Sequence, residues 1–87
     1  MIWKITLSSE SLRFLTKQPA VVQMRIDKKL RWLASLQDPQ EITKPLQGNF
    51  LGFHRLRIGN IRVILEYQLL ELIIHVSRIA FRGNVYN

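Results

Sequence analysis

The pattern of hydrophobic and polar positions changes its period along the chain. Residues 2–7 alternate between the two classes, which predicts a strand. Residues 8–17 begin with serines that can cap a helix, and residues 19–37 carry hydrophobic side chains on one helical face. Pro19 separates these two segments, so the pattern predicts a helical hairpin. The stripe of the second helix is Val22, Ile26, Leu30, Leu33 and Leu36.

Beyond Gly48 the period falls from about 3.6 residues to two. Segments 53–58 and 61–67 alternate on either side of Gly59-Asn60, a dipeptide typical of tight hairpin turns. Residues 71–80 are nearly continuous Leu, Ile and Val, which is typical of a central strand covered on both sides. The element order β-α-α-β-β-β predicts an α+β domain. We expect a small antiparallel β-sheet with the N-terminal helical hairpin packed on one face and the other face partly open.

Length and charge narrow the classes of function. The chain has 87 residues, which predicts a single domain over 1–87. Thirteen Lys and Arg against six Asp and Glu give a formal charge of +7, which favours a polyanionic partner: nucleic acid, an anionic membrane surface or an acidic protein. The absence of cysteine excludes disulfides, a thiol nucleophile and the usual structural zinc sites. With no signal peptide or membrane-spanning stretch in the pattern, we expect a soluble cytoplasmic protein.

Arginines gather in the second half of the chain. Five arginines and no lysine follow Gly52, and Arg55, Arg57 and Arg62 lie on one face of the predicted hairpin by parity. A guanidinium is always charged and its planar fork of donors fits phosphate, so this face is a candidate phosphate clamp. The alternative is that these are solvated strand positions that protect a sheet edge against aggregation. The pattern alone leaves both interpretations open.

The two histidines alternate with apolar residues. This placement predicts that the rings of His54 and His75 pack on the core side. If His54 faced outward instead, it would lie beside the arginines and could carry a proton.

Aromatic residues near the ends of the elements have two interpretations. Tyr86 follows Arg82 by four residues and could stack on a nucleic-acid base or close the core. Trp3 and Trp32 are expected in the core or between helix and sheet. No metal-ligand motif and no glycine-rich phosphate loop is present in the sequence, so no metal and no small-molecule cofactor is predicted.

Three stretches together resemble the RelE/ParE superfamily of bacterial toxins. They are Lys44-Pro-Leu-Gln-Gly48, then Phe-His-Arg-Leu-Arg-Ile-Gly-Asn-Ile-Arg-Val over 53–63, then Arg-Ile-Ala-Phe-Arg-Gly-Asn-Val-Tyr over 78–86. The usual family form is K-L-x-G, then W-R-I-R-x-G-x-Y-R-V, then V-x-H-R-x-x-V-Y. The resemblance covers essentially the whole chain. It implies a small antiparallel sheet with an N-terminal helical hairpin, as the pattern does.

The resemblance also implies an activity and partners. RelE-type members are metal-independent endoribonucleases that cut mRNA in the ribosomal A site, use the RNA 2′-hydroxyl as nucleophile and are held inactive by a cognate acidic, RelB-like antitoxin. The alternative within the superfamily is a ParE-type toxin, which binds DNA gyrase and cleaves no RNA. By position the catalytic group would comprise Arg55, Arg57, Arg62, Arg82 and Tyr86. Arg78 and His54 would contact the RNA.

Two departures from the family pattern bear on the chemistry. Some active members have lysines where this chain has Arg55 and Arg57, and an arginine cannot serve as a base. Phe81 stands where many members have histidine. The proton acceptor is therefore unassigned by the motifs, with His54 the nearby imidazole and Glu66 the nearest carboxylate by parity.

Overall fold

A computed structural model describes residues 2–82 of the chain. The elements follow in the order β1 (Lys4–Leu7), α1 (Ser9–Thr16), α2 (Ala20–Ala34), η1 (Pro39–Glu41), β2 (Lys44–Pro45), η2 (Gly48–Phe50), β3 (His54–Ile58), β4 (Ile61–Gln68) and β5 (Ile73–Phe81). The predicted α+β class and order of the main elements are confirmed. The short strand β2 and the two 3-10 turns beside it were not predicted.

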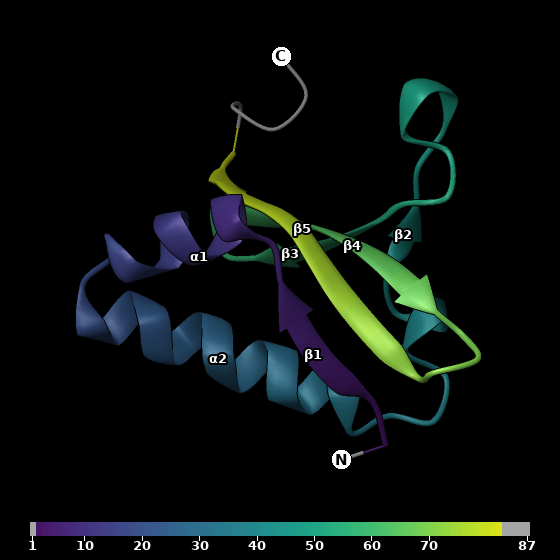
Figure 1. Ribbon diagram of the computed structural model, residues 1–87. Helices are drawn as coiled ribbons and strands as arrows, with labels where there is room; N and C mark the ends of the chain where they lie inside the picture. The colour runs from purple at the N-terminus through teal and green to yellow at the C-terminus, as the bar shows by residue number, and fades with distance from the viewer. Residues whose placement is uncertain (1, 83–87) are drawn as a thin grey trace.

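The strands form a single five-stranded sheet in the order β1-β5-β4-β3-β2 (Figure 1). The pairs β2–β3, β3–β4 and β4–β5 are antiparallel, as expected. The pair β1–β5 is parallel, with Lys4 opposite Ile73 and Leu7 opposite Val76, which corrects the expectation of a wholly antiparallel sheet. As a result, β1 and β2 are the two edges of the sheet.

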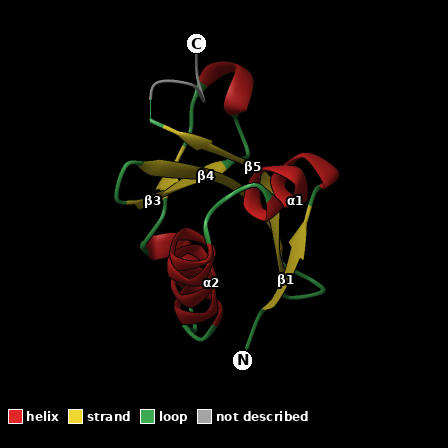
Figure 2. Cartoon of the chain, turned by 90° about the vertical axis from the view of Figure 1, so that its left-hand side faces the viewer, coloured by secondary structure: helices red, strands yellow, loops and turns green. Residues whose placement is uncertain are grey.

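Both helices lie on one side of the sheet and enclose the core. Figure 2 views α2 nearly end-on beneath β3 and β4, with α1 beside β5. The α2 stripe packs against the inward positions of the strands, and Ile26, Leu33, Val63, Leu65 and Ile74 have no accessible surface to within one percent. The predicted position of the helical hairpin and the open opposite face are therefore confirmed.

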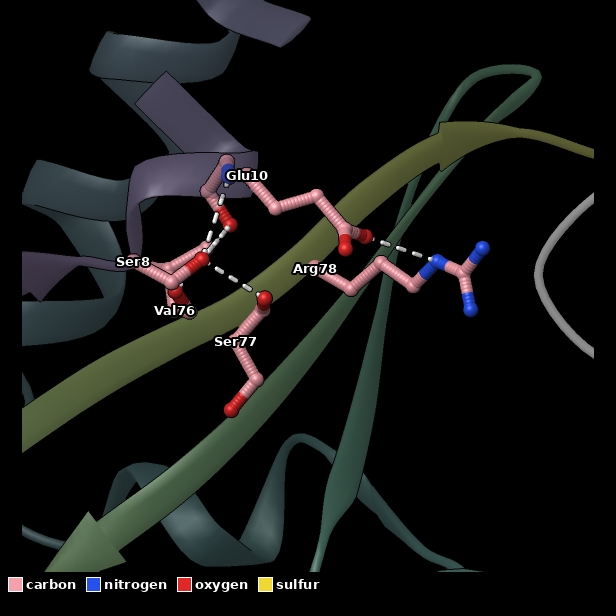
Figure 3. A network of polar contacts seen from close by, with 6 residues as sticks. Ser8, Glu10, Val76, Ser77 and Arg78 are labelled. Atoms are coloured by element: carbon pink, nitrogen blue, oxygen red, sulfur yellow. Dashed lines mark hydrogen bonds and ion pairs between the residues drawn. The ribbon is translucent and has the colours of Figure 1, made fainter. Parts of the chain in front are cut away.

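A bulge in β5 meets the start of α1. Ile64 pairs with Arg78 and Leu65 with Val76, so Ser77 is an extra residue in β5. The carbonyl oxygens exposed at this point are satisfied by the helix: Ser8 Oγ donates to Ser77 O at 2.7 Å, and Ser11 Oγ donates to Val76 O at 3.0 Å (Figure 3). Ser8 Oγ also accepts the Ser11 backbone N–H at 3.1 Å, which caps α1. These contacts fix α1 against the part of β5 that lies beyond the end of β1.

Burial alternates along β5, with Ile74, Val76 and Ile79 buried and the residues between them partly or fully exposed. The expectation that this strand is covered on both faces is therefore wrong, because the two helices cover only one side of the sheet. No helix among residues 2–82 is long and apolar enough to cross a membrane.

Candidate nucleic-acid interface

Three arginines of the β3–β4 hairpin lie on the open face of the sheet. Arg57 pairs directly with Arg62, and Arg55 lies two positions back on β3 opposite Ile64. The intervening residues Leu56 and Val63 are buried in the core on the other face. The parity prediction for these arginines is confirmed. The turn that joins the strands contains Gly59 at a φ of +60°, a conformation that glycine adopts without strain.

Arg82 comes to the same end of the hairpin from β5. The ladder continues from Arg62 opposite Ala80 to a hydrogen bond in which the Arg82 backbone N–H donates to Asn60 O at 2.6 Å. Arg82 directly follows the end of β5 and comes two residues after Ala80, so continuing the alternation of that strand predicts that its side chain lies on the side of the sheet that carries Arg62. We call the group Arg55, Arg57, Arg62 and Arg82 the arginine face. Tyr86, the fifth expected member of the site, lies outside the described residues.

The arginine face concentrates positive charge. Arg57, exposed to solvent, takes part in no ion pair within residues 2–82, and neither does Arg55 or Arg82. An anion bound at this face would therefore meet the exposed guanidinium of Arg57, which no carboxylate of the described residues neutralises.

Lysines that the sequence analysis did not select extend this surface around the edge of the sheet. Lys44 of β2 pairs with Arg55. Because β2 ends there, the backbone edge of β3 from Leu56 to Ile58 has no strand partner among the described residues. A groove of about 340 Å³ follows this edge. Its lining is Lys29, Ile42, Lys44, Arg55, Leu56 and Arg57. The sequence signal for Lys44 was its place at the head of the first motif stretch.

His54 lies on the opposite face from the arginines. Its ring packs edge-on against Tyr67, with 4.9 Å between ring centroids, and its Nδ1 is 3.0 Å from Thr43 Oγ1. Burial lowers the pKa of the imidazole, while a hydrogen bond with the Thr43 backbone opposes this effect. The prediction of a core-side ring is confirmed, and the structure does not bring His54 together with the arginine face as an RNA contact.

His75 is the reverse case. It lies between Ile74 and Val76, whose side chains are fully buried, and therefore faces the open side of the sheet. Its Nδ1 is 2.8 Å from Thr6 Oγ1, and Glu66 is its ladder partner on β4. The expectation of a core-side ring is wrong for this histidine.

Arg78 is held by an acidic residue of α1. Its Nε lies 3.0 Å from Glu10 Oε2, and the side chains are 49% and 54% exposed, respectively (Figure 3). Arg78 and Arg55 share a row of the sheet, but Ile64 of β4 stands between them. The structure therefore places this expected RNA contact next to the arginine face, with its charge compensated.

The described part of the interface offers charge stabilisation without a base. Glu66 is two strand alternations from Arg62 and accepts a hydrogen bond from Ser77 Oγ at 3.2 Å. Phe81, at the position of the family histidine, packs edge-on against Phe14 of α1, with 5.4 Å between centroids. No imidazole or carboxylate of residues 2–82 belongs to the arginine face, and no three His, Cys, Asp or Glu side chains gather there as metal ligands would.

No protein-family model and no curated protein matches this sequence. Solved structures do match the fold. One chain of the toxin–antitoxin complex RelBE2 from Mycobacterium tuberculosis gives a TM-score of 0.82 at 18% identity, over 94% of this chain and 100% of that one. A chain of the RelE–RelB complex of Pyrococcus horikoshii gives a TM-score of 0.77 at 21% identity, over 97% of this chain and 99% of that one. The isolated RelE toxin of Escherichia coli gives a TM-score of 0.72 at 14% identity, over 97% of this chain and 88% of that one. The RelE-like fold that the motifs implied is thus confirmed.

Proposed function

We propose that this chain is the toxin of a toxin–antitoxin pair and that it acts as a metal-independent endoribonuclease on mRNA in the ribosomal A site. One observation carries the proposal: Arg57 and Arg62 pair directly on an open sheet face, with Arg55 two residues before Arg57 on β3 and Arg82 beside the hairpin turn. A cluster of guanidinium groups without a described carboxylate among them is suited to a phosphodiester. The RelE-like fold supports the same interpretation.

The proposed reaction is an internal phosphoryl transfer. The RNA 2′-oxygen forms a bond to the adjacent phosphorus, the bond from phosphorus to the 5′-oxygen breaks, and the products are a 2′,3′-cyclic phosphate and a 5′-hydroxyl. The 2′-hydroxyl loses one proton, and the leaving oxygen gains one. Arg55 and Arg57 would neutralise the scissile phosphate, Arg62 would clamp it, and Arg82 would stabilise the charge on the leaving oxygen. Tyr86 would stack on a base and orient it.

The proton acceptor is not among the described residues of the arginine face, because arginine does not lose its proton. We propose that a group of the ribosome or solvent takes this proton and that the protein contributes positioning and electrostatic stabilisation. Electrostatic stabilisation is often the largest catalytic contribution. Such an enzyme would be slow on free RNA and much faster on a programmed ribosome.

The partner we propose is an acidic antitoxin that adds a strand or helix at β1. This edge strand borders a groove of about 270 Å³, which is lined by Ile5, Leu7, Leu15, Ile26 and Leu30 together with charged residues. On the adjoining helices, Leu12, Val21 and Met24 are at least half exposed. A free strand edge beside exposed apolar side chains suits β-augmentation or an amphipathic helix, and the net charge of +7 favours an acidic chain.

The experiment measures cleavage of an mRNA on programmed ribosomes by the purified chain. During purification, before the chain meets the ribosomes, a metal chelator removes any metal bound to it. We expect cuts in phase with codons, with 5′-hydroxyl and 2′,3′-cyclic phosphate ends. Arg57→Gln should reduce cleavage, and the exposed Arg13→Gln on α1 should not. Intact mRNA at protein concentrations equal to those of the ribosome would contradict the nuclease assignment.

A second candidate function is binding to DNA gyrase, as in ParE-type toxins. The observation that favours it is the lack of an imidazole or carboxylate in the described arginine face. The two functions separate cleanly after expression in cells. Codon-phased mRNA cuts support the ribonuclease, whereas DNA damage with intact mRNA supports gyrase binding.

A further inference from the structure

One face of α2 carries charge and an aromatic ring instead of the buried stripe. Arg25, Lys28, Lys29 and Trp32 follow the spacing i, i+3, i+4, i+7, which places them along one side of the helix. Ile26, by contrast, is completely buried. Trp32 is 41% exposed and therefore lies outside the core; of the two expected positions, it is nearer the second, because it lines a groove between helix and sheet with Ile58 of β3.

These four residues and Ile58 of β3 line a groove of about 360 Å³, which we call the α2 groove. The Lys29 Nζ atom lies 4.4 Å from the centroid of the Trp32 ring, close enough for a cation–π interaction. The Nη1 atom of Arg25 is 3.8 Å from the position that a Cβ atom at Gly59 would occupy. The guanidinium of Arg25 therefore lies beside the turn that also supports the arginine face.

The α2 groove is continuous with the surface at the edge of β3. Lys29 lines both this groove and the one that contains Lys44, Arg55 and Arg57. No carboxylate lines either groove. Within residues 2–82, none of the six cations involved takes part in an ion pair. The result is a strip of positive charge that runs from Arg55 and Arg57 around β3 to α2.

We propose that the α2 groove is a second RNA-binding site, which takes single-stranded RNA beyond the phosphate held by the arginine face. Its floor of indole and Ile58 would receive a base, and Arg25, Lys28 and Lys29 would neutralise flanking phosphates. The proposal rests on the RNA-binding part of the proposed function. It adds a substrate footprint outside the cleavage site.

The chemistry of the groove favours RNA over an acidic protein segment. The α2 groove contains none of the exposed aliphatic side chains of the helices, Leu12, Val21 and Met24, that an amphipathic helix would bury. The α2 groove instead offers one exposed indole, with the Lys29 ammonium over the ring and Arg25 and Lys28 in the same lining. Every base has a face that can stack on such a ring, where it would take the place of Lys29. Its continuity with Arg55 and Arg57 matches the path of a strand that those residues already hold.

Binding to a non-cleavable RNA tests the proposal. The probe is a fluorescein-labelled 2′-O-methyl oligouridine of about 12 nucleotides, a length within the range that single-strand sites cover. The full chain is titrated into the probe at several KCl concentrations, and the fluorescence anisotropy is measured.

Two double variants separate the groove from general charge. Arg25→Gln combined with Lys28→Gln removes two charges from the groove, and Arg13→Gln combined with Lys17→Gln removes two exposed charges from α1 and its cap. In a plot of the logarithm of the binding constant against the logarithm of the KCl concentration, the first double variant should make the slope less negative by about 1.4. The second double variant should leave this slope near the wild-type value. Equal flattening by both would overturn the proposal.

Tryptophan fluorescence gives a second readout of the same site. Trp32 is exposed while Trp3 is only 4% exposed, so an RNA base in the α2 groove should quench the Trp32 signal. The quenching should disappear in Trp32→Phe, which retains a ring and most of the affinity, and Trp32→Ala should bind about 5- to 150-fold more weakly. Quenching that survives in Trp32→Phe would contradict the proposal. If a polyglutamate peptide quenched Trp32 equally at the same salt concentration, the proposal would be overturned, and the ligand of the groove would be an acidic protein chain.

The outcomes separate this inference from the nuclease assignment. The 2′-O-methyl probe has no free 2′-hydroxyl, so binding is measured without cleavage. RNA binding that depends on Arg25 and Lys28, together with no cleavage on ribosomes, would keep the α2 site and overturn the nuclease. Cleavage on ribosomes with the two double variants binding alike would keep the nuclease and overturn the α2 site.

Discussion

The hydroxyl oxygens of Thr43 and Tyr67 lie 2.8 Å apart and join the segment before β2 to strand β4. The Tyr67 O–H also donates to Pro39 O at 3.2 Å, and Thr43 Oγ1 is 3.0 Å from His54 Nδ1. Thr43 is 4% exposed, so water cannot readily replace these partners. The network holds β2 in place, and β2 in turn carries Lys44 opposite Arg55 at the rim of the interface.

Thr43→Val should therefore destabilise the fold. The substitution keeps the volume but removes the buried hydroxyl that the partly buried His54 and Tyr67 contact, so the free energy of unfolding should fall by about 1–3 kcal/mol. Urea denaturation followed by circular dichroism measures it. Thr16→Val is the matched control, because Thr16 is exposed in α1 and its hydroxyl bonds only Arg13 O, at 3.2 Å. Equal losses in the two variants would show that the network contributes nothing specific.

Stability should also depend on pH through His54. Burial lowers the pKa of this imidazole below its usual 6.5, so the unfolded chain takes up a proton first as the pH falls. The free energy of unfolding should be unaffected by this group well above pH 6.5 and should decrease as the pH falls through 6.5 toward the lowered value. Urea midpoints between about pH 7.5 and pH 5 measure the decrease.

His54→Gln should remove this part of the pH dependence, since an amide does not titrate in this range. His75→Gln leaves His54 in place and should therefore retain it. A slope that is the same in wild type and His54→Gln would show that His54 is not responsible.

The part of the interface encoded by local pattern could be predicted from sequence. The Gly59-Asn60 turn sets the register of β3 and β4, and strict alternation then fixes Arg55, Arg57 and Arg62 on one face. The side of α2 on which Trp32 lies could also be predicted, because Trp32 is outside the hydrophobic stripe and shares its helical face with Arg25, Lys28 and Lys29. The pattern alone left the core and a contact between helix and sheet as the two positions for this ring.

The rest depends on contacts between residues far apart in sequence. The extra residue Ser77 shifts the parity of β5, so counting back from buried Ile79 gives the wrong face for His75. The parallel pairing of β1 with β5 joins segments about seventy residues apart, and the strand Lys44–Pro45 is too short to produce an alternation. The Glu10–Arg78 ion pair likewise follows from the docking of α1 on β5.

Arg57→Gln should separate binding from stability. The change removes an exposed cation that takes part in no ion pair among residues 2–82, so the free energy of unfolding should stay level. RNA binding should weaken, and the salt dependence for a single strand should flatten by about 0.7. Arg31→Gln is the control, because Arg31 is exposed and pairs with Asp27 at 2.8 Å away from both grooves. A loss of stability in Arg57→Gln with unchanged RNA affinity would assign Arg57 a purely structural role.

Glu10→Gln tests whether Arg78 can contact RNA. The ion pair is half exposed and contributes little to stability, so the variant should remain folded. It frees the Arg78 guanidinium on the same row of the sheet as Arg55, and one further phosphate contact should steepen the log–log salt dependence of RNA binding by about 0.7. Asp27→Asn makes the same change in net charge but frees Arg31 on α2, so its salt dependence should stay at the wild-type value. Anisotropy titrations of the oligouridine probe measure all three proteins. Steepening in both variants would indicate a general charge effect, and steepening in neither would remove Arg78 from the RNA interface.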